Sequence, residues 1–581
     1  MSPHAFPTPE QQTVIEHDGS AFVMACPGAG KTRVMVERAR RLFSDLPAGC
    51  GVAFLSFTRA AISELETRLR KERILPSPVF PSFVGTFDSF VWQFLVAPFG
   101  VKGSDARPRL IADVADLAVT PPGYTHSLSL SCFCRMTGII LDKAAKARGF
   151  DVSQKPIYQV QAYVTAAAAL RAGLRARGYL GFDEARGAAL ERLKDAEQGT
   201  RIAAALAGRF REVIVDEAQD CNPDDLEVIS SFRNSGLSVK VICDPHQSIY
   251  GFRGGLTDQL FAYAETFRED ERKVLTGNFR SSPSICKATA QLRPLAVRIL
   301  PDEPLGRHKD DTTPVRIFSY GGNKVPDKIG TVFFSYVKSM GLNPASCPIV
   351  AATKASGAAA AGQPRPIDSS VRAVRLAEAV TGFQFAAGFN DMKRSIEQAH
   401  IVLLELEDRL GNFSYHQYLA ENEIEQASWR PQVLFLLREL RFDPSRHSNA
   451  KAWHTAAKDL LAEHLTLKNE PGLSQRFKWN KNIADALVPV PSATAMPRTI
   501  HSVKGMEFPA VCVVTTARTL GRILDYLETG EPADMAEDTR KLYVAASRAE
   551  RLLVIAAPRS QANRLAAHLR GHGAKVEIED I

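Results

Sequence analysis

Eight consecutive residues near the start of the chain have the types and spacing that phosphate binding requires. Residues 25–32 read Ala-Cys-Pro-Gly-Ala-Gly-Lys-Thr and depart from the pattern G-x-x-x-x-G-K-[ST] only at the first position. Gly28 and Gly30 allow backbone N–H groups to converge on phosphate oxygens, and Lys31 can reach the β and γ phosphates. Thr32 can offer its hydroxyl to Mg²⁺. This loop therefore predicts a binding site for ATP and Mg²⁺.

An acidic pair farther along the chain could supply the chemistry of such a site. Asp216 and Glu217 directly follow the apolar run 213–215. Asp216 could hold Mg²⁺, directly or through water, and Glu217 could polarise the water that attacks the γ phosphate. An exposed acidic turn is the alternative interpretation. The loop at Lys31 favours hydrolysis of a nucleoside triphosphate.

Short apolar runs that alternate with helical patterns would position these residues. Helical patterns cover residues 32–42 and 60–71. The strand-like runs are residues 20–25, 51–57, 213–215, 239–243, 315–318, 349–352, 511–514 and 553–556. Strands that alternate with helices favour a parallel sheet covered on both faces. Because the series breaks and resumes after residue 280, the sequence predicts an α/β fold with two parallel-sheet cores.

Two largely helical stretches interrupt these cores. Residues 101–205 are rich in Ala, Arg and Leu and are locally basic, and residues 367–490 are again mainly helical. The tract from Ala351 to Pro366 is rich in Ala, Gly and Pro, a composition typical of a flexible connection. Each core is therefore expected to carry one mainly helical insertion.

The composition is typical of a soluble globular protein. Hydrophobic residues make up 45% and charged residues 23% of the 581 residues, and no apolar run is long enough to span a bilayer. The N-terminus lacks a secretory signal, and the nine cysteines show no zinc or iron–sulfur spacing. A reduced, cytoplasmic protein is expected. Its net charge of +8 permits an anionic partner without requiring one.

The loop and the acidic pair belong to a longer set of short motifs in a fixed order. The further members are Thr8–Gln11, Leu55–Ala61, Gly85–Phe90, Asp244–Gly254, Asn278–Ser281, Thr499–Phe508 and Leu542–Ala549. In that order they resemble the Gln motif and motifs Ia, Ib, III, IV, V and VI of the UvrD/Rep-like helicases of superfamily 1. Each motif alone is weak, but their order across residues 8–549 is specific for this family.

The resemblance implies two RecA-like cores, 1A and 2A, with insertions 1B and 2B. Core 1A, with the ATP site, would comprise 1–100 and 206–280, and insertion 1B would comprise 101–205. Core 2A would comprise 281–366 and 491–581, with 367–490 as a reduced insertion 2B. The strand-rich segment that normally opens the second insertion of the family is missing from this sequence.

The resemblance also implies roles around the nucleotide. Arg280 and Arg548 would reach the γ phosphate as arginine fingers, and Gln247 would sense that phosphate. Phe279 would stack on adenine, where the family usually has Tyr, and Glu507 would contact the ribose. The remaining contacts would come from Gln11, Gly28, Ala29, Gly30, Lys31, Thr32 and Arg33. The catalytic set would be Lys31, Glu217, Gln247, Arg280 and Arg548, with Thr32 and Asp216 at the metal.

A face that binds single-stranded DNA is implied as well, because aromatic rings can stack on bases of any sequence. The implied contacts are Phe57, Thr86, Phe87, Tyr250, Phe252, Arg253 and His501. Core packing is the alternative for Phe57 and Phe87. Asp88 stands where the family usually has His, and a carboxylate is a poor partner for phosphate. The cluster Arg476–Lys481 mixes cations with aromatic rings and could bind DNA, with a solvated helix or loop end as the alternative.

The implied function is that of an ATP-dependent translocase or helicase on single-stranded or tailed duplex DNA, moving 3′ to 5′, in DNA repair or anti-phage defence. In its reduced second insertion and in Asp88, the chain resembles helicase subunits encoded beside OLD-type nucleases in Gabija-type anti-phage systems. That resemblance implies an OLD-type nuclease partner, and the lack of a long apolar run predicts no association with a membrane. One alternative is a nucleotide- and DNA-sensing regulatory subunit that controls a partner nuclease with little unwinding of its own. Another is an RNA helicase.

Overall fold

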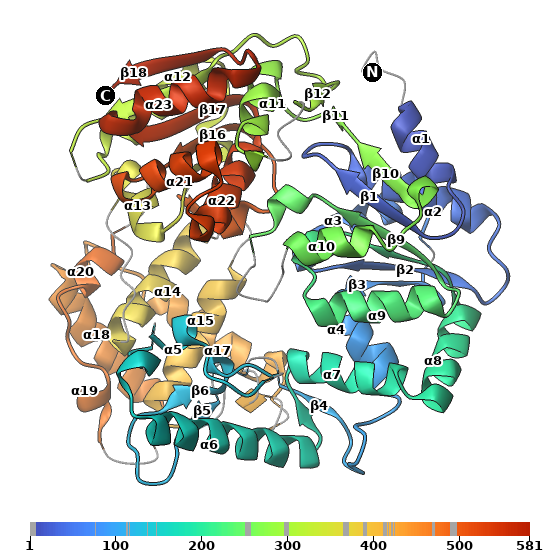
Figure 1. The fold of residues 1–581 in the computed structure, drawn as a ribbon. Coiled ribbons are helices and arrows are strands. Elements are labelled where there is room, and N and C mark those ends of the chain that lie inside the picture. Colours follow the sequence, from blue (N-terminus) through green and yellow to red (C-terminus); the bar gives the residue numbers. More distant parts are fainter. Residues whose placement is uncertain are drawn as a thin grey trace. The chain divides into compact units, whose positions relative to one another are not determined.

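A computed structural model gives the architecture of the chain (Figure 1). It describes residues 7–581 except 76, 112–113, 115–116, 136, 147, 250–256, 296–300, 323, 364–370, 387–391, 411–414, 416–417, 420–421, 423, 468–470 and 489–496. The chain forms two compact units. One comprises Met1–Phe99, Arg186–Gln363 and Ala493–Ile581, and the other comprises Gly100–Ala185 and Pro364–Ser492.

The first unit contains two parallel six-stranded sheets, the first with strand order β10-β1-β9-β8-β2-β3. Its strands are β1 (Ala21–Ala25), β2 (Gly51–Ser56), β3 (Phe83–Thr86), β8 (Phe210–Val215), β9 (Ser238–Cys243) and β10 (Arg272–Leu275). Because all strands run the same way, their carboxyl ends share one edge. The loops that leave β1, β8 and β9 at this edge carry the predicted nucleotide-binding residues.

Helices cover both faces of this sheet because side chains alternate along each strand. In β1, Val23 packs in a cluster with Val34 of α2 (Lys31–Ser44), whereas the ring of Phe22 packs against Tyr263 of α10 (Thr257–Ala264). The other helices of this region are α1 (Pro9–Glu16), α3 (Arg59–Lys71), α4 (Phe87–Phe90), α7 (Phe182–Leu193), α8 (Ala196–Arg209) and α9 (Pro223–Asn234).

The second sheet has the order β15-β14-β16-β17-β13-β18 and is also parallel. Its strands are β13 (Val315–Tyr320), β14 (Ile349–Ala351), β15 (Arg498–Thr499), β16 (Phe508–Val514), β17 (Ala549–Pro558) and β18 (Val576–Asp580). The helices beside it are α11 (Pro283–Ala290), α12 (Lys328–Ser339), α21 (Ala517–Thr529), α22 (Ala536–Ala546) and α23 (Arg559–Leu569). The two α/β cores predicted from the sequence are therefore confirmed.

The faces of the second sheet follow the same alternation. Val511 and Val513 of β16 pack in a cluster with Leu520 of α21, whereas Cys512 packs in a different cluster with Phe333 of α12. Between the two sheets in sequence, the short strands β11 (Gly277–Asn278) and β12 (Glu303–Pro304) pair in parallel. This pairing holds the segment that contains Asn278–Arg280 in an ordered conformation.

The prediction of a flexible connection from residue 351 to 366 was wrong for its first part. Residues Lys354–Ala360 form helix α13. The side chain of Thr353 caps this helix by accepting a hydrogen bond from the backbone N–H of Ser356 at 3.2 Å. Alanine has the highest helix propensity, so an Ala-rich tract with a Thr cap forms a helix where composition alone indicated a linker.

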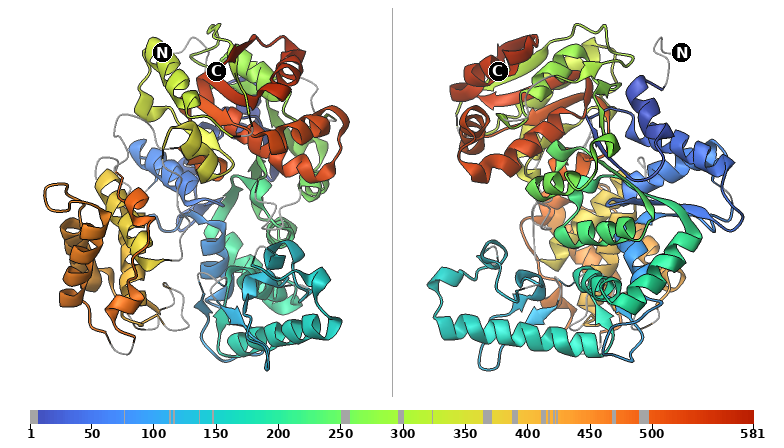
Figure 2. Two further views of the ribbon diagram at one scale, coloured as in Figure 1. Left: turned by 90° about the vertical axis from the view of Figure 1, so that its left-hand side faces the viewer. Right: turned by 45° about the vertical axis from the view of Figure 1, so that its right-hand side comes forward.

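The second unit contains residues of both insertions, each with its own apolar core. The first insertion is built on the long helix α6 (Ile157–Ala176), which is seen well in Figure 2, and on α5 (Asp142–Lys146). Its described residues also form the short strands β4 (Arg109–Leu110), β5 (Ala118–Val119), β6 (Leu128–Ser129) and β7 (Tyr179–Leu180).

The described part of the second insertion, within residues 371–488, is helical and contains no strand. Its helices are α14 (Arg372–Ala386), α15 (Lys393–Leu406), α17 (Gln426–Glu439), α18 (Ala450–His464), α19 (Leu473–Arg476) and α20 (Ile483–Ala486). Across the described parts of the chain, no helix has both the length and the apolar character needed to cross a bilayer.

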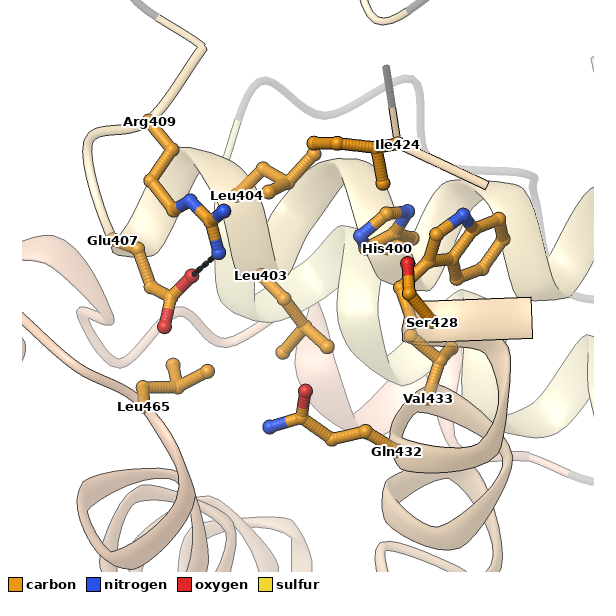
Figure 3. A pocket seen from close by; sticks show the side chains of 11 residues that line it. His400, Leu403, Leu404, Glu407, Arg409, Ile424, Ser428, Gln432, Val433 and Leu465 are labelled. Carbon is orange, nitrogen blue, oxygen red and sulfur yellow. Dashed lines mark hydrogen bonds and ion pairs between the residues drawn. The ribbon is translucent and has the colours of Figure 1, made fainter. Parts of the chain in front are cut away.

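A cavity of about 230 Å³ lies inside the second insertion (Figure 3). The rings of His400 and Trp429 stack at its border with centroids 3.8 Å apart. Burial, reinforced by the positive charge of Arg409, lowers the pKa of His400 to about 4, so this ring is neutral. None of the predicted site residues lines the cavity.

Candidate active site

The phosphate-binding loop occupies the turn between β1 and α2, at the carboxyl edge of the first sheet. Gly28 and Gly30 have φ values of 72° and 75°, in the left-handed region that favours glycine. A Cβ on Gly28 would lie 2.6 Å from Asn278 Oδ1 and 2.7 Å from Arg280 Cβ. Only glycine therefore fits at this position, and the backbone N–H groups remain accessible at the helix N-terminus.

Gln11 closes this loop from the N-terminal side. Its Nε2 donates to the carbonyl of Ala29 at 3.0 Å, and its Oε1 accepts from the backbone N–H of Thr8 at 3.0 Å. The side chain of Thr8 caps α1 in return, which completes a capping box. The predicted nucleotide residue Gln11 is therefore placed beside the loop by the start of α1.

Lys31 begins α2 in a strongly acidic setting. Desolvation works against its charge, but the carboxylates of Glu217, Asp244 and Asp216 outweigh that effect and raise its pKa. Conversely, burial and then the neighbouring charge of Glu217 raise the pKa of Asp216 to about 7. The site thus places three carboxylates close to Lys31, and the pKa of Asp216 is raised in spite of that lysine, which is the situation that a bound cation relieves.

Asp216 and Glu217 leave the end of β8 in a strained turn. Asp216 is 7% exposed, and its Oδ1 is buried without a hydrogen-bond partner among the described residues. Glu217 has a φ of 58°, which is uncommon for a residue with a side chain and occurs in functional turns. Although desolvation opposes ionisation, Lys31 and two further cations hold the pKa of Glu217 below its ordinary value.

These residues fit a magnesium ion held together with nucleotide phosphates. The unpartnered Asp216 Oδ1 is the kind of hard oxygen ligand that Mg²⁺ prefers, and Thr32 is the second residue of α2. Across the described residues, no group of three or more His, Cys, Asp or Glu side chains forms a complete metal site. Mg²⁺ usually binds through one or two carboxylates plus substrate phosphates, so a sparse protein ligand set is the expected one.

Side-chain hydrogen bonds lead from Glu217 to the second sheet. Gln219 donates to Glu217, and its Oε1 accepts from the backbone N–H of Asp244 at 3.0 Å. Gln247 Nε2 donates to Asp244 Oδ2 at 2.8 Å. Arg548, from the turn between α22 and β17, then donates through Nη2 to Gln247 Oε1 at 2.6 Å. The two predicted catalytic residues Gln247 and Arg548 are therefore in direct contact.

Arg548 is buried at 2% exposure in this position. Burial, and next the positive charge of Arg280, lower its pKa to about 10. It stays a cation at neutral pH. Its Nε also donates to the carbonyl of Val544 at 3.1 Å, so the second sheet holds the side chain while its end reaches the first.

Arg280 lies beside the same loop. Its Nη1 donates to the carbonyl of Ser547 at 2.9 Å and its Nη2 donates to Glu507. Burial disfavours the charge of Glu507, but Arg280 nevertheless holds the pKa of that carboxyl below its ordinary value. The backbone N–H of Phe279 donates to the carbonyl of Gly28 at 2.9 Å. This bond places Phe279 against the phosphate loop, and Arg280 directly beyond it.

A second polar contact between elements of the two sheets is fully buried. Lys504 Nζ donates to both carboxylate oxygens of Asp220 at 2.6 Å, with side-chain exposures of 3% and 0%. A buried ion pair that loses one partner leaves an uncompensated charge. The pair therefore fixes the segment after Glu217 against the second sheet.

The structure thus brings together most of the predicted nucleotide residues, including Lys31, Asp216, Glu217, Gln247, Arg280 and Arg548. Arg33, the third residue of α2, is exposed. Sequence reasoning missed five polar residues that connect the set, namely Gln219, Asp220, Asp244, Asn278 and Lys504. All five lie within or directly beside the recognised motifs. The signal that could have found them was a polar residue at a motif position to which no role had been assigned.

The predicted DNA-binding residues are only partly described. Tyr250, Phe252 and Arg253 lie outside the described residues. Thr86 caps α4 by accepting from the backbone N–H of Ser89 at 3.2 Å. His501 is half-buried in the turn Ile500–Val503, and burial, followed by the charge of Lys541, lowers its pKa.

The two predicted phenylalanines differ in accessibility. Phe57 and Phe87 stack with ring centroids 5.3 Å apart. Phe57 is half-buried, whereas Phe87 is fully buried and so offers no surface for a base. Core packing, the alternative interpretation of these rings, therefore describes Phe87, which supports Phe57 from beneath.

The cluster Arg476–Lys481 begins with structural residues. Arg476 is buried and donates to the carbonyls of Pro471 and Leu406, each at 2.7 Å. Phe477 is fully buried and stacks on His454. Trp479 remains 43% exposed. Arg476 and Phe477, two of the five aromatic or basic residues of this cluster, are therefore used to build the second insertion, whereas Lys478, Trp479 and Lys481 are exposed.

Comparison with protein families bears directly on this arrangement. Residues 7–268 match the UvrD/REP helicase N-terminal domain, and residues 496–560 match the UvrD-like helicase C-terminal domain. The chain belongs to the UvrD/Rep-like helicases of superfamily 1. The two matches contain both sides of the contact between Gln247 and Arg548.

Individual relatives of this family are distant in sequence. ATP-dependent DNA helicase UvrD1 of Mycobacterium tuberculosis is 26% identical over 298 residues, which is 48% of this chain and 38% of that protein. Putative ATP-dependent DNA helicase YjcD of Bacillus subtilis is 21% identical over 96% of this chain and 79% of its own length. ATP-dependent DNA helicase UvrD2 of M. tuberculosis is 23% identical, over 93% and 77%. The match thus covers less than half of UvrD1.

Proposed function

We propose that this protein is an ATP-dependent translocase on single-stranded DNA that can act as a helicase. The observation that carries the proposal is the hydrogen bond between Gln247 and Arg548, because it joins the two sheets beside the phosphate loop. A cation that reaches the reacting phosphate only when the two cores approach makes hydrolysis depend on cleft closure. Repeated closure and opening is the cycle that a motor needs.

The nucleotide half of this cycle follows from the geometry of the first sheet. Lys31 and the N-terminus of α2 would bind the β and γ phosphates, and Asp216 and Thr32 would hold Mg²⁺. Mg²⁺ held there would supply positive charge that offsets the negative charge of the phosphates. Glu217 would accept a proton from the attacking water, since neighbouring cations keep its carboxylate ionised. Arg548 and Arg280 would stabilise charge that develops on the phosphate.

The DNA half is supported by family membership and by the exposed part of Phe57. Translocation from 3′ to 5′ and a role in DNA repair or anti-phage defence are further parts of the proposal. A nuclease partner, and the alternative of a regulatory subunit that controls it, remain predictions from the sequence.

The deciding experiment measures ATP turnover against the concentration of single-stranded DNA. The proposal requires strong stimulation by DNA and weaker stimulation by RNA of the same sequence. Duplexes with a 3′ or a 5′ single-stranded tail then separate helicase from translocase and give the polarity. Turnover that does not respond to DNA would contradict the proposal, whereas stimulation without strand displacement would limit it to translocation.

A further inference from the structure

Asp88 has a partner that the motif pattern does not explain. It is the second residue of α4, and its carboxylate accepts a hydrogen bond from Nη2 of Arg186. Arg186 is 7% exposed, although arginine is rarely buried without a paired charge. The carboxylate of Asp88 therefore forms an ion pair with a buried arginine, which explains how an acidic residue is accommodated at this motif position.

The same guanidinium contacts a second carboxylate. Arg186 Nε donates to Oδ1 of Asp225 at 2.5 Å, and Asp225 is 1% exposed. Burial raises the pKa of Asp225 to about 6 in spite of Arg186, so the carboxylate remains mostly ionised at neutral pH. The fork of the guanidinium suits this arrangement because it presents several donors in one plane.

Asp225 connects this pair to the nucleotide motif. Its Oδ2 accepts from the backbone N–H of Asn222 at 3.0 Å, and its own N–H donates to Asn222 Oδ1 at 2.9 Å. This capping box begins α9 shortly after the turn that contains Glu217 and Asp220. Lys504 donates hydrogen bonds to Asp220, and Arg186 donates to Asp225. The segment from Asp220 to Asp225 is therefore fixed at both ends.

At its other end the network meets a predicted DNA-binding segment. Asp88 lies between Phe87, whose ring supports Phe57, and Ser89, which is hydrogen-bonded to Thr86. Movement of this turn would move Thr86 and the stacked rings together. The residues Asp88, Arg186 and Asp225 thus form a polar connection between the Thr86–Phe90 turn and the segment after Glu217.

We propose that Asp88, Arg186 and Asp225 are positioning residues that couple DNA held at the Thr86–Phe90 turn to ATP turnover. The inference rests on the proposed function and adds a set of contacts through which DNA binding would affect ATP turnover. None of the three residues contacts nucleotide phosphates in this scheme. Their effect is on how much DNA is needed to stimulate turnover, rather than on the chemical step.

Two conservative variants test these contacts. Arg186→Lys keeps the charge but cannot contact both carboxylates in the same way, and we expect it to raise the DNA concentration for half-maximal turnover about fivefold or more. Asp88→Asn keeps the size and one acceptor oxygen, and we expect a rise of about threefold. Turnover without DNA and turnover at saturating DNA should both stay within about twofold of wild type.

A matched control is available on the same helices. Lys194, just after α7, pairs with Glu227 of α9 at 2.6 Å, but these side chains are 61% and 44% exposed. Glu227→Gln breaks an ion pair there without touching the Thr86–Phe90 turn. Exposed pairs contribute little, so this variant should match wild type in DNA dependence.

A double variant separates coupling from general damage. If Asp88 and Arg186 act through each other, Asp88→Asn with Arg186→Lys should need no more DNA than Arg186→Lys alone. An unchanged DNA requirement in the single variants, or equal losses in turnover with and without DNA, would overturn the inference. If wild-type turnover ignored DNA altogether, the proposed function would fail first and this inference with it. If DNA stimulates wild-type turnover but the variants need no more DNA than wild type, only the positioning role is refuted.

Discussion

The two sheets contribute unlike groups to the same site. The first sheet supplies Lys31, Asp216 and Glu217 from loops at strand ends, and one carboxylate oxygen there has no partner among the described residues. The second sheet supplies Arg548 and Lys504, and both are held by side chains of the first sheet. The first set is built to receive a ligand, whereas the second set is already engaged with protein.

This difference indicates that the two sheets have different roles in ATP turnover. The first sheet carries the predicted phosphate- and metal-binding residues Lys31, Thr32 and Asp216 on its own loops. The second sheet adds cations whose placement depends on contact between the sheets. Changes in the first set should therefore reduce ATP turnover under all conditions, and changes in the second set should mainly reduce the turnover that DNA stimulates.

The largest effect is expected for Lys31→Ala, which should abolish ATP turnover with and without DNA. Lys31 is the only cation of residues 25–32, so its loss removes both a phosphate contact and the charge that stabilises the transition state. Alanine keeps the first turn of α2, so circular dichroism should show an unchanged fold. The exposed Lys71→Ala, at the end of α3, is the control. Wild-type turnover in Lys31→Ala would refute the site assignment.

The next largest effect is expected for Glu217→Gln. The amide cannot accept the proton of the attacking water, and loss of a general base costs roughly 10²–10⁴-fold in turnover. Binding of ATP and of single-stranded DNA should persist, which fluorescence anisotropy with a labelled ATP analogue and, separately, with a labelled oligonucleotide would show. Glu227→Gln serves again as the control, because that glutamate lies on α9 away from the loop. Loss of nucleotide binding in Glu217→Gln would mean that Glu217 has a structural role instead.

Arg548→Ala should discriminate between the two sheets. Nucleotide binding should survive because the first sheet is intact, while DNA-stimulated turnover should fall about 10²–10³-fold. The control is Arg551→Ala on β17, since Arg551 pairs with Asp311 at 2.9 Å and does not reach the first sheet. Equal losses with and without DNA would show that Arg548 does not depend on DNA for its placement, and the proposed division would fall.

The sequence predicted that Lys31, Asp216 and Glu217 belong together, and the structure places them near one another because they follow strands with strong local signals. The apolar runs that became β1, β8 and β9 were visible, and the carboxyl edge of a parallel sheet gathers whatever follows them. The connecting residues were not predicted. Gln219, Asp244 and Lys504 act through contacts between distant parts of the chain, and no periodicity reports such contacts.

The predictions for the DNA-binding residues were less specific, because a motif does not report exposure or pairing. A motif places Phe57 and Phe87 together but does not tell which ring is exposed, because that depends on packing against the rest of the sheet. Asp88 was recognised as a departure from the family, yet its partner Arg186 lies far along the chain in α7. Only the folded structure shows that the carboxylate is paired.

The smallest effect is expected for Glu507→Gln, which tests a half-exposed contact against the buried ones. Glu507 pairs with Arg280, but its side chain is 51% exposed. Ion pairs in contact with solvent contribute about 0.2–1 kcal/mol, so KM for ATP should rise by no more than about fivefold, with kcat nearly unchanged. Comparison of ATP with dATP would test the predicted ribose contact, since a lost contact to the 2′ hydroxyl raises KM for ATP more than for dATP. A large fall in kcat would instead place Glu507 with the catalytic residues, and Arg280 would then depend on it for its position.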